Sequence, residues 1–195
     1  MPLKELCNVI TKGTTPTTLG KSFTTYGINY IKAESITNYH AIDLKKIAFI
    51  DETTNQKLKR SILKEGDIIF TIAGTLGRFS LIDKKILPAN TNQAIAIIRA
   101  NREKISSNYL YSCFLGNWHN EYYSKHVQQA VQANLSLSTI KALPIPILTD
   151  QQMSQYLDAI TPRIIMIKQT ESENSYLENL RDTLLPYLIS SKEFN

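Results

Sequence analysis

The sequence predicts an α+β protein in which a strand-rich body is followed by a long C-terminal helix of the coiled-coil type. Three observations predict this fold class. Short runs of β-branched and aromatic residues alternate with turn residues in the first part of the chain. All seven glycines lie at or before Gly116. Beyond residue 150, apolar residues recur at spacings of three and four, as they do along one face of a helix. We therefore expect a body over residues 1–148 and a helical region over residues 149–195.

Length and composition place the chain among folded proteins. Its 195 residues, 43% of them apolar, suffice for one domain with an appendage and for a core that needs no disulfide or metal. Cys7 and Cys113 fit a reducing compartment rather than a disulfide framework. The first eight residues lack a signal-peptide pattern, and no apolar run approaches the roughly 20 residues of a membrane span. We expect a soluble, cytoplasmic protein with no membrane partner.

The body is expected to contain mostly short strands, with a few helices. Turn residues such as Gly13, Pro16 and Gly66 bound the strand runs. Short helices are expected at residues 3–7 and 54–60, and Ser106 is a candidate N-cap for a helix that runs to about His126. The expected strands are residues 9–11, 27–31, 46–50, 67–72, 79–82 and 94–99.

Residues 140–148 are expected to form a stiff connector between the body and the C-terminal helix. Pro144 and Pro146 have no N–H donor and favour extended backbone. Within the helical region, the Thr-Pro pair at residues 161–162 indicates either a kink or the start of a second helix. Pro186 is expected to bend or end the helix.

The C-terminal helix has an apolar seam that is too hydrophobic to face solvent along its length. Two arrangements would cover it: the helix folds back on its own body, or it pairs with another helix. We favour pairing, since the connector is expected to carry the helix away from the body. The register slips near the middle of the seam, where a polar residue can fix the alignment of paired helices. The expected dimer-interface residues are Leu157, Ile160, Ile164, Ile167, Asn174, Leu177, Arg181, Leu184 and Leu188.

The chain lacks a recognisable catalytic or metal-binding motif. Gly13 and Gly20 are separated by six residues, whereas a P-loop has four between its glycines so that successive amides cradle phosphate. Cys113, His119 and His126 fall near one expected helix, but the two turns that separate the histidines do not suit zinc. We therefore expect no catalytic residue, no metal and no cofactor, so a binding role is the default.

Charge is divided unevenly along the chain. The first 150 residues contain 18 Lys and Arg against 11 Asp and Glu, whereas the last 45 contain four against six. A cationic body with polar loops suits a nucleic acid, because cations bind phosphates while amide, hydroxyl and guanidinium groups reach base edges. The alternative for each loop is an ordinary turn, and for each lysine cluster a solvated surface.

Five polar segments carry the candidate groups: loop one (residues 12–22), loop two (32–40), loop three (73–78), loop four (88–93) and loop five (128–134). Glycines 74 and 77 in loop three permit close approach to a nucleic-acid backbone. Gln93 and Asn134 add amides in loops four and five. The candidate DNA-binding residues are Lys12, Thr14, Thr15, Lys21, Lys32, Thr37, Tyr39, His40, Lys59, Arg60, Thr75, Arg78, Asn92, Gln128, Gln129 and Gln132.

In their order and spacing, several segments resemble the specificity (S) subunit of type I restriction–modification systems. The segments similar to the target-recognition domain of that family are residues 11–16 (TKGTTP), 27–31 (GINYI), 61–70 (SILKEGDIIF), 73–77 (AGTLG) and 92–93 (NQ). Motifs between residues 134 and 152 resemble the junction into the long spacer helix, and residues 179–190 (NLRDTLLPYLIS) resemble its closing segment. The resemblance spans nearly the whole chain.

The resemblance implies a non-catalytic subunit that recognises double-stranded DNA. It implies that a modification (methyltransferase) subunit binds S-adenosylmethionine and a restriction subunit binds ATP, both as partners of this chain. A typical S subunit has two recognition domains and two antiparallel helices. This sequence is similar to half of one, with a target-recognition domain over residues 1–148 and a spacer and dimerisation helix over residues 149–195. We therefore expect a homodimer that reads a symmetric, bipartite site, with pairing to another S half, as in a split subunit, as the alternative.

Two other classes of function stay open. One is an enzyme, either a degenerate nucleotide hydrolase or a nuclease. The other is a protein-interaction adaptor whose basic body is incidental. Turnover of ATP or plasmid DNA by the isolated chain would favour the first class, and indifference to DNA would favour the second.

Overall fold

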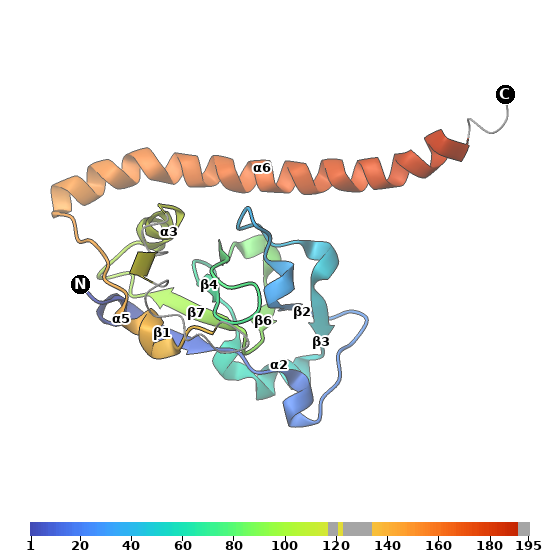
Figure 1. Cartoon of the computed structure of the whole chain (residues 1–195), viewed down its shortest axis with the longest axis horizontal. Helices are drawn as coiled ribbons and strands as arrows, with labels where there is room; N and C mark the ends of the chain where they lie inside the picture. The colour runs from blue at the N-terminus through green and yellow to red at the C-terminus, as the bar shows by residue number, and fades with distance from the viewer. Residues whose placement is uncertain (117–120, 123–133, 191–195) are drawn as a thin grey trace.

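A body of strands and short helices lies beneath one long helix in the computed structural model of the chain (Figure 1). The structure describes residues 1–116, 121–122 and 134–190. The expected α+β class is confirmed. The strands are β1 (Cys7–Lys12), β2 (Ile28–Ile31), β3 (Ala48–Ile50), β4 (Ile68–Thr71), β5 (Phe79–Leu81), β6 (Ala89–Thr91) and β7 (Ile95–Ala100). The α-helices are α1 (Leu3–Leu6), α2 (Glu52–Lys57), α3 (Ser107–Leu115), α5 (Leu137–Ala142) and α6 (Asp150–Ser190).

The larger sheet of the described residues has the strand order β1-β7-β4-β5, and all its neighbours are antiparallel. Both faces of its central strand β7 are covered. Ala96 and Ile98 belong to a core cluster with α1, α3 and α5, whereas Ile95 and Ile97 belong to a second cluster on the other face. Burial on both faces explains why β7 reads as a continuous apolar run rather than an alternating one.

The smaller sheet has the order β3-β2-β6, with β2 parallel to β6. The sequence predicted every strand except β6. Two of its residues, Asn90 and Thr91, have polar side chains, and asparagine is also depleted in strands. Both are fully buried, and hydrogen bonds satisfy them. Asn90 Nδ2 donates to Asn55 Oδ1 at 2.9 Å, and Thr91 Oγ1 donates to the Ile31 carbonyl at 2.8 Å.

Helix α3 begins as predicted, because Ser106 Oγ accepts a hydrogen bond from the Asn108 amide at 3.2 Å. Its Phe114 ring lies 5.6 Å from the ring of Phe79 in β5, so α3 covers the larger sheet. The helix ends at Leu115 rather than near residue 126, since a glycine with low helix propensity follows. Residues 117–120 and 123–133 lie outside the described residues.

The connector differs from the prediction in two ways. Its first residues belong to α5, which was not predicted and which Ser136 caps by accepting a hydrogen bond from the Thr139 amide at 3.0 Å. The extended part after α5 packs against the start of the chain. The Ile145 amide donates to the Met1 carbonyl at 2.8 Å, and Pro144 forms a β-bridge with Pro2. The connector is therefore tied to the body.

Helix α6 is one continuous helix that lies along its own body, with Pro162 and Pro186 inside it (Figure 1). Of the alternatives that the two prolines left open, the start of a second helix at residue 162 and an end at residue 186 are therefore excluded. The side chain of Ile164 is 3% exposed, within the core cluster, and Lys45 of the body forms an ion pair with Asp182 at 2.6 Å. The expectation that the connector carries the helix away from the body is also wrong.

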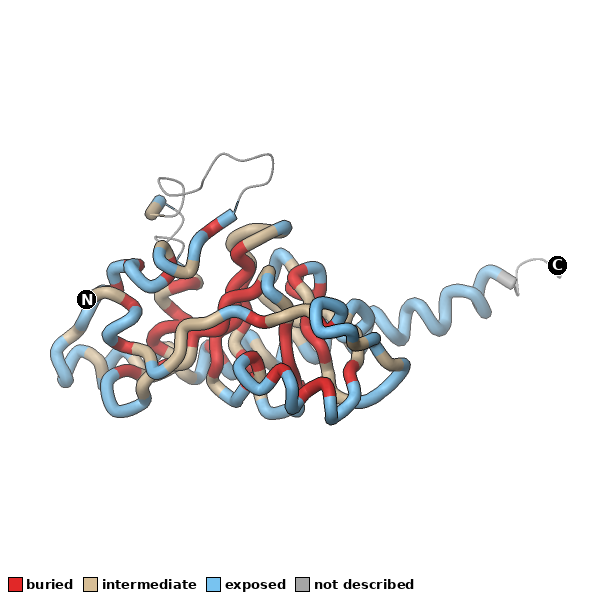
Figure 2. Tube along the Cα trace, turned by 90° about the horizontal axis from the view of Figure 1, so that it is seen from below, coloured by how far each residue is buried: buried red, intermediate tan, exposed pale blue. Residues whose placement is uncertain are grey.

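The C-terminal part of α6 extends past the body and is exposed (Figure 2). Large apolar side chains in the second half of the helix, among them Leu177 at 57% and Leu184 at 47%, are exposed. The helix thus folds back on its own body over its first part and leaves apolar surface uncovered over its second. No described helix is long and apolar enough to cross a membrane.

Candidate nucleic-acid interface

The loops that carry the candidate residues leave the two sheets at a common end. Lys12 of β1 and Thr71 of β4 pair with residues 95–96 of β7. In the smaller sheet, Ile31 of β2 pairs with Thr91 of β6. The Ile72 amide, next after β4, donates to the Ala94 carbonyl at 2.8 Å and so extends the β4–β7 pairing, while residues 92–94 link the end of β6 to the start of β7. Loops one, two and three and the end of loop four therefore start at neighbouring strand ends.

Loop one is packed against β6 at its second residue, Gly13. A Cβ added to Gly13 would lie 2.0 Å from the Thr91 carbonyl oxygen, so no other residue fits there without movement of the backbone. The Gly13 amide donates to the Ile95 carbonyl at 3.4 Å. Glycine permits such close approach because it lacks a side chain. This packing fixes where loop one begins.

Side chains from two other segments bind loop one. Arg60 Nη2 donates to Thr14 Oγ1 at 3.1 Å from the short helix at Lys59–Ser61. Thr15 Oγ1 donates to Gln93 Oε1 of loop four. Residues far apart in the sequence, 14, 60 and 93, therefore form one polar surface.

Loops two and three also support each other. Thr75 Oγ1 donates to the Ala33 carbonyl at 3.3 Å, and Arg78 Nη1 donates to the Ile36 carbonyl at 2.8 Å. Asn134, the last residue of loop five, forms a β-bridge with Ala73. Asn134 therefore lies beside the start of loop three.

His40 is a structural residue of loop two rather than a phosphate-binding cation. Its ring stacks on the Phe79 ring with centroids 3.7 Å apart, and its Nδ1 accepts from the Phe79 amide at 3.5 Å. Burial lowers the pKa of His40, and the charges of Lys168 and Arg78 lower it further. The imidazole is therefore neutral at pH 7. Its φ of 66° lies in the left-handed region, which histidine adopts more readily than most residues.

Helix α6 forms the far wall of a cleft beside loop two. The cleft has a volume of about 730 Å³, and its walls include Thr37 and Arg78 from the body and Asn174 and Arg181 from α6. Beneath it, Lys168 Nζ lies 2.8 Å from Glu171 Oε2, and both side chains are largely buried. Sequence reasoning missed this pair, whose signal was the i,i+3 spacing of opposite charges.

The charges on this surface are partly balanced by neighbouring acids. Lys32 Nζ lies 2.8 Å from Glu34 Oε1. Hydrogen bonds from Thr53 and the Thr54 amide lower the pKa of Asp51 to about 2, and the charge of Lys21 lowers it too. Lys21 therefore lies beside an ionised acid at the margin of the surface.

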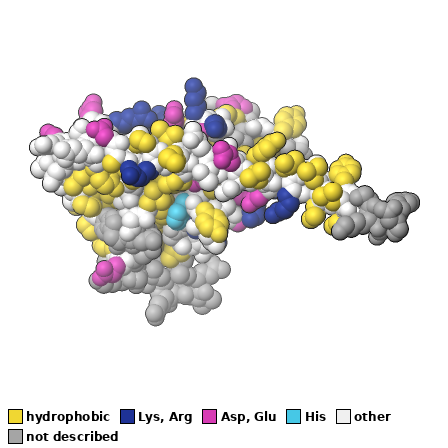
Figure 3. All heavy atoms as spheres, turned by 90° about the horizontal axis from the view of Figure 1, so that it is seen from above, with side chains coloured by type: hydrophobic (Ala, Val, Ile, Leu, Met, Phe, Trp, Pro, Cys, Tyr) yellow, Lys and Arg dark blue, Asp and Glu magenta, His cyan; other side chains and the backbone are white. Residues whose placement is uncertain are grey.

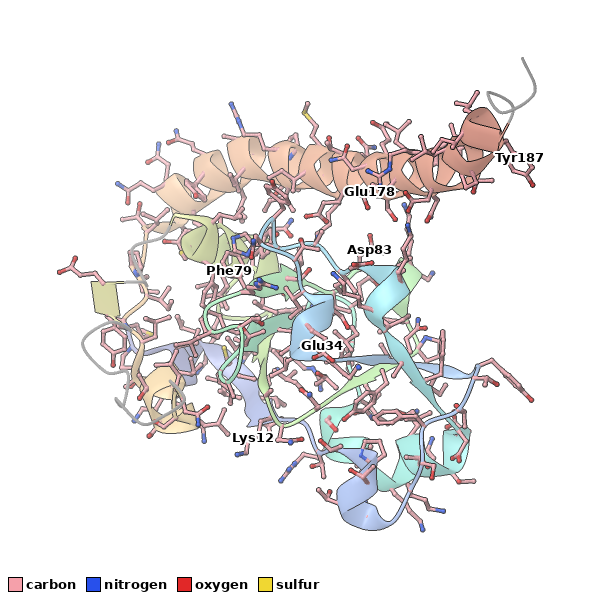
Figure 4. The ribbon with its side chains drawn as sticks, turned by 45° about the vertical axis from the view of Figure 1, so that its right-hand side comes forward. Lys12, Glu34, Phe79, Asp83, Glu178 and Tyr187 are labelled. Atoms are coloured by element: carbon pink, nitrogen blue, oxygen red, sulfur yellow. The ribbon has the colours of Figure 1, made fainter. Side chains whose placement is uncertain are left out.

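The predicted DNA-binding residues fall into three groups. Those at the common strand end define the loop surface, together with Gln93 of loop four: Lys12, Thr14, Thr15, Lys32, Arg60, Thr75 and Asn92. Thr37, Tyr39, His40 and Arg78 lie between that surface and α6. Lys21 and Lys59 lie at its margin, and Gln128, Gln129 and Gln132 lie outside the described residues. In Figure 4, Lys12 lies on the part of the body remote from α6, and Glu34 lies between Lys12 and the helix.

The structure also places the predicted dimer-interface residues. Leu157, Ile160 and Ile164 pack against the chain's own core, where α6 covers α3. Ile167 is 37% exposed. The remaining five residues, Asn174, Leu177, Arg181, Leu184 and Leu188, are exposed. Contact between two helices would therefore have to use a different face over residues 157–164.

Among the described residues, no group of three His, Cys, Asp or Glu side chains could hold a metal ion. Burial raises the pKa of Cys7 to about 12 and that of Cys113 to about 11, so neither thiol is activated as a nucleophile. The chemistry that the surface offers is that of cations, hydroxyls and amides, which suits binding.

Residues 1–174 match the family model for the type I restriction modification DNA specificity domain. No curated protein matches the sequence. Solved structures with a similar fold include the following three. A Type-I restriction-modification system S subunit from M. genitalium aligns with 99% of this chain and 46% of its own, with a TM-score of 0.63 and 14% identity.

The HsdS subunit from Thermoanaerobacter tengcongensis aligns with 95% of this chain and 47% of its own, with a TM-score of 0.58 and 16% identity. A chain from a structure of complex assembly and conformational transition of the type I R-M system aligns with 95% of this chain and 44% of its own, with a TM-score of 0.55 and 15% identity. The chain spans less than half the length of each of these proteins. At such identities, the similarity is one of fold.

Proposed function

The chain belongs to the family of type I restriction–modification DNA specificity domains, and we propose that its loop surface recognises a specific sequence in double-stranded DNA. One observation carries the proposal: loops from four strands meet at one end of the sheets and present cations, hydroxyls and amides together. Rigid strands position the loops, and loops with different side chains can read different bases on the same scaffold.

The residues of the loop surface divide the work between affinity and specificity. Lys12, Lys32 and Arg60 supply positive charge for phosphates, which contributes affinity without sequence information. The hydroxyls of Thr14 and Thr15 and the amides of loop four can donate to and accept from base edges. Arg78 acts by holding loop two through the Ile36 carbonyl.

The chain would serve a complex in which other subunits catalyse methylation and cleavage. A modification subunit would bind S-adenosylmethionine, and a restriction subunit would bind ATP, so this chain needs no cofactor. The family assignment supports DNA and these subunits as partners. The two buried thiols, whose pKa values are raised, support a binding role, and we propose that the complex is cytoplasmic.

A second copy of the chain would pair with the first through α6, which would place one loop surface on each side of a two-fold axis. The support for this is the exposed apolar surface on the C-terminal part of the helix. A two-fold assembly reads a site made of two inverted half-sites separated by unread base pairs. Pairing with another S half would give an asymmetric site instead.

Fluorescence anisotropy with duplex oligonucleotides tests DNA recognition. We expect Lys12→Ala to weaken binding to all duplexes alike and to reduce the slope of log affinity against log salt by about one. Lys4→Ala, an exposed cation on α1, is the matched control. Equal binding by the wild type and the Lys12→Ala protein at every salt concentration would rule out the loop surface as the DNA contact.

A further inference from the structure

A cationic segment without acidic residues includes the end of helix α2 and the turn that follows it. Residues 53–64 contain four Lys and Arg and no Asp or Glu. Three of them, Lys57, Lys59 and Arg60, are exposed and are called the cationic turn below. Leu58, between them, is 3% exposed and belongs to a core cluster with residues of β2 and β3. The turn is therefore anchored to the body by its apolar residue and presents its charges to solvent.

The charges of the cationic turn are not balanced by neighbouring acids. No ion pair joins the three side chains to an acid among the described residues. Lys32 and Lys45, in contrast, are paired with Glu34 and Asp182. Basic and acidic side chains are likewise interspersed on the α6 side of the molecule (Figure 3). The cationic turn is thus available to an anionic partner, and closely spaced cations suit the phosphates of a duplex.

The cationic turn lies beside loop one, on the side of the body remote from α6. Arg60 Nη2 of the turn donates to Thr14 Oγ1 at 3.1 Å. Helix α2, which leads into the turn, lies on that side in Figure 1, and Lys12 lies there in Figure 4. A duplex bound by loop one would therefore pass the cationic turn.

A buried amide in strand β6 fixes the turn to the scaffold. Asn90 is fully buried, and its Nδ2 donates to the Leu58 carbonyl at 3.3 Å and to Asn55 Oδ1 of α2 at 2.9 Å. Its Oδ1 accepts from the Thr91 amide at 2.8 Å. Because a carbonyl can only accept and a backbone amide can only donate, this orientation of the Asn90 side chain is the one that satisfies its neighbours.

Strand β6 leads directly into loop four, so Asn90 joins the cationic turn to a second part of the loop surface. Three residues after Asn90, Gln93 accepts a hydrogen bond from Thr15 of loop one. Arg60 of the turn donates to Thr14 of the same loop. The turn, loop one, loop four and β6 thus form a closed ring of contacts. A displacement at Asn90 would shift the turn relative to both loops.

We propose that the cationic turn is a phosphate-binding site and that Asn90 is its positioning residue. This inference rests on the proposed DNA recognition by the loop surface, and it adds Lys57 to the DNA contacts. The turn holds the sugar–phosphate backbone of the duplex whose bases loops one and four read. Phosphate contacts fix the register of a protein on a duplex. Asn90, acting through the Leu58 carbonyl, sets the spacing between the backbone contact and the base contacts.

The salt dependence of binding tests the phosphate contact. Anisotropy of the full-length protein with a labelled duplex of mixed sequence would compare the wild type with the double variant Lys57→Ala, Lys59→Ala. Loss of two phosphate contacts should lower the slope of log affinity against log salt by about two. Between about 50 and 200 mM salt, the wild type should therefore lose roughly tenfold more affinity than the double variant. The matched control is Lys4→Ala with Lys141→Ala, which removes two exposed cations from α1 and α5 and should leave the slope unchanged.

An unchanged slope in the lysine double variant would overturn the phosphate site. Lys12→Ala in the same assay judges the loop surface separately. If Lys12→Ala lowers the slope and the lysine double variant does not, DNA recognition by the loop surface stands and the cationic turn is no part of it.

The role of Asn90 is tested by the same lysine changes in an altered background. Asn90→Asp keeps the shape of the side chain but replaces its donor by an acceptor, which then faces two acceptors. In this background, Lys57→Ala with Lys59→Ala should change the slope by less than about half a unit, because the displaced turn no longer meets the phosphates. Asp67→Asn, a buried change in the larger sheet, is the control for lost stability and should preserve the full effect of the lysines.

Asn55→Ala is a milder variant, because it removes one acceptor of Asn90 and leaves the contact with the Leu58 carbonyl. It should retain only part of the effect of the two lysines on the slope. Circular dichroism would check the fold of each variant before binding is measured, and if Asn90→Asp does not fold, Asn55→Ala decides alone. A full effect of the lysines in every folded background would overturn the positioning role of Asn90 while leaving the phosphate site in place.

Discussion

Replacement of Gly13 by alanine should displace loop one and so weaken DNA binding more than a change of one methyl group would suggest. The added Cβ would lie 2.0 Å from the Thr91 carbonyl oxygen and 2.5 Å from the Asn92 carbonyl oxygen. Both neighbours are backbone atoms of β6 and loop four, so neither can rotate away as a side chain could. Relief requires that the strand ends move apart.

The expected cost follows from overpacking. Insertion of a methyl group into a site closed by backbone typically costs about 1–3 kcal/mol. For a chain of this size, about 2–4 °C of melting temperature is lost per kcal/mol, so we expect a decrease of roughly 2–12 °C. Loop one would also lose the alignment of Thr14 with Arg60 and of Thr15 with Gln93, which the structure maintains by hydrogen bonds. DNA affinity should therefore fall even well below the melting temperature.

Differential scanning calorimetry and anisotropy, measured on the same protein, separate the two effects. Gly20→Ala is the matched control, because Gly20 also lies in loop one but a Cβ there meets nothing within 4 Å. Its φ of 65° makes alanine cost about 1–2 kcal/mol without displacing the strand ends. DNA affinity that is equal for the two variants would refute the claim that close packing at Gly13 positions loop one.

Three further substitutions test the packing and charge pairing that hold the body and α6 together. Ile164→Ala should lower the free energy of unfolding by about 2–5 kcal/mol, because Ile164 is 3% exposed. The control substitution Ile165→Ala, at a residue that is 52% exposed, should change it by less than about 0.5 kcal/mol. Chemical denaturation measures both. Asp67→Asn should cost about 3–5 kcal/mol, since fully buried Asp67 accepts two hydrogen bonds from Arg99 at 2.7 Å; a small loss would show that the pair is dispensable. Because the pKa of His40 is lowered in the fold, protonation favours the unfolded chain, so stability should be fully present above about pH 6.5 and decline below it. His40→Asn should reduce the decrease of the melting temperature between pH 6.5 and 5. If the variant shows the same decrease as the wild type, His40 is not its cause.

Strands could be predicted from the sequence where burial of the strand requires a run of apolar residues. The apolar runs of β4 and β7 are fully buried, and burial on two faces requires such runs. Strand β6 was missed because its polar residues are satisfied by partners from α2 and β2, which are remote in sequence. Hydrogen bonds between distant segments have no signature in local periodicity.

The course of α6 was misjudged for a related reason. A proline in a helix usually breaks it, yet Pro162 lies inside α6, at its fourth turn, next to residues that pack on the body. The body covers the first half of the predicted apolar seam and leaves the second half exposed. The sequence alone could not assign its first half to the body, because that depends on the connector, which is tied to the start of the chain by the Ile145 amide.

The candidate site was predictable as a set of residue types but not as a surface. Lys12, Lys32 and Asn92 were named from their polarity, and the strand register explains why they lie at one end. The supporting role of Arg78 and the stacking of His40 on Phe79 depend on tertiary contacts. Such contacts decide which polar residues remain available to a ligand.

Methylome sequencing of cells that express the chain with its modification subunit tests the central claim most directly. The account predicts one new methylated motif made of two inverted half-sites at a constant separation, which Lys12→Ala together with Arg78→Ala weakens or abolishes. A genome without any new methylated motif, although the complex is present, would contradict the claim that the loop surface reads DNA. A motif that lacks inverted symmetry would instead contradict the pairing of two identical copies.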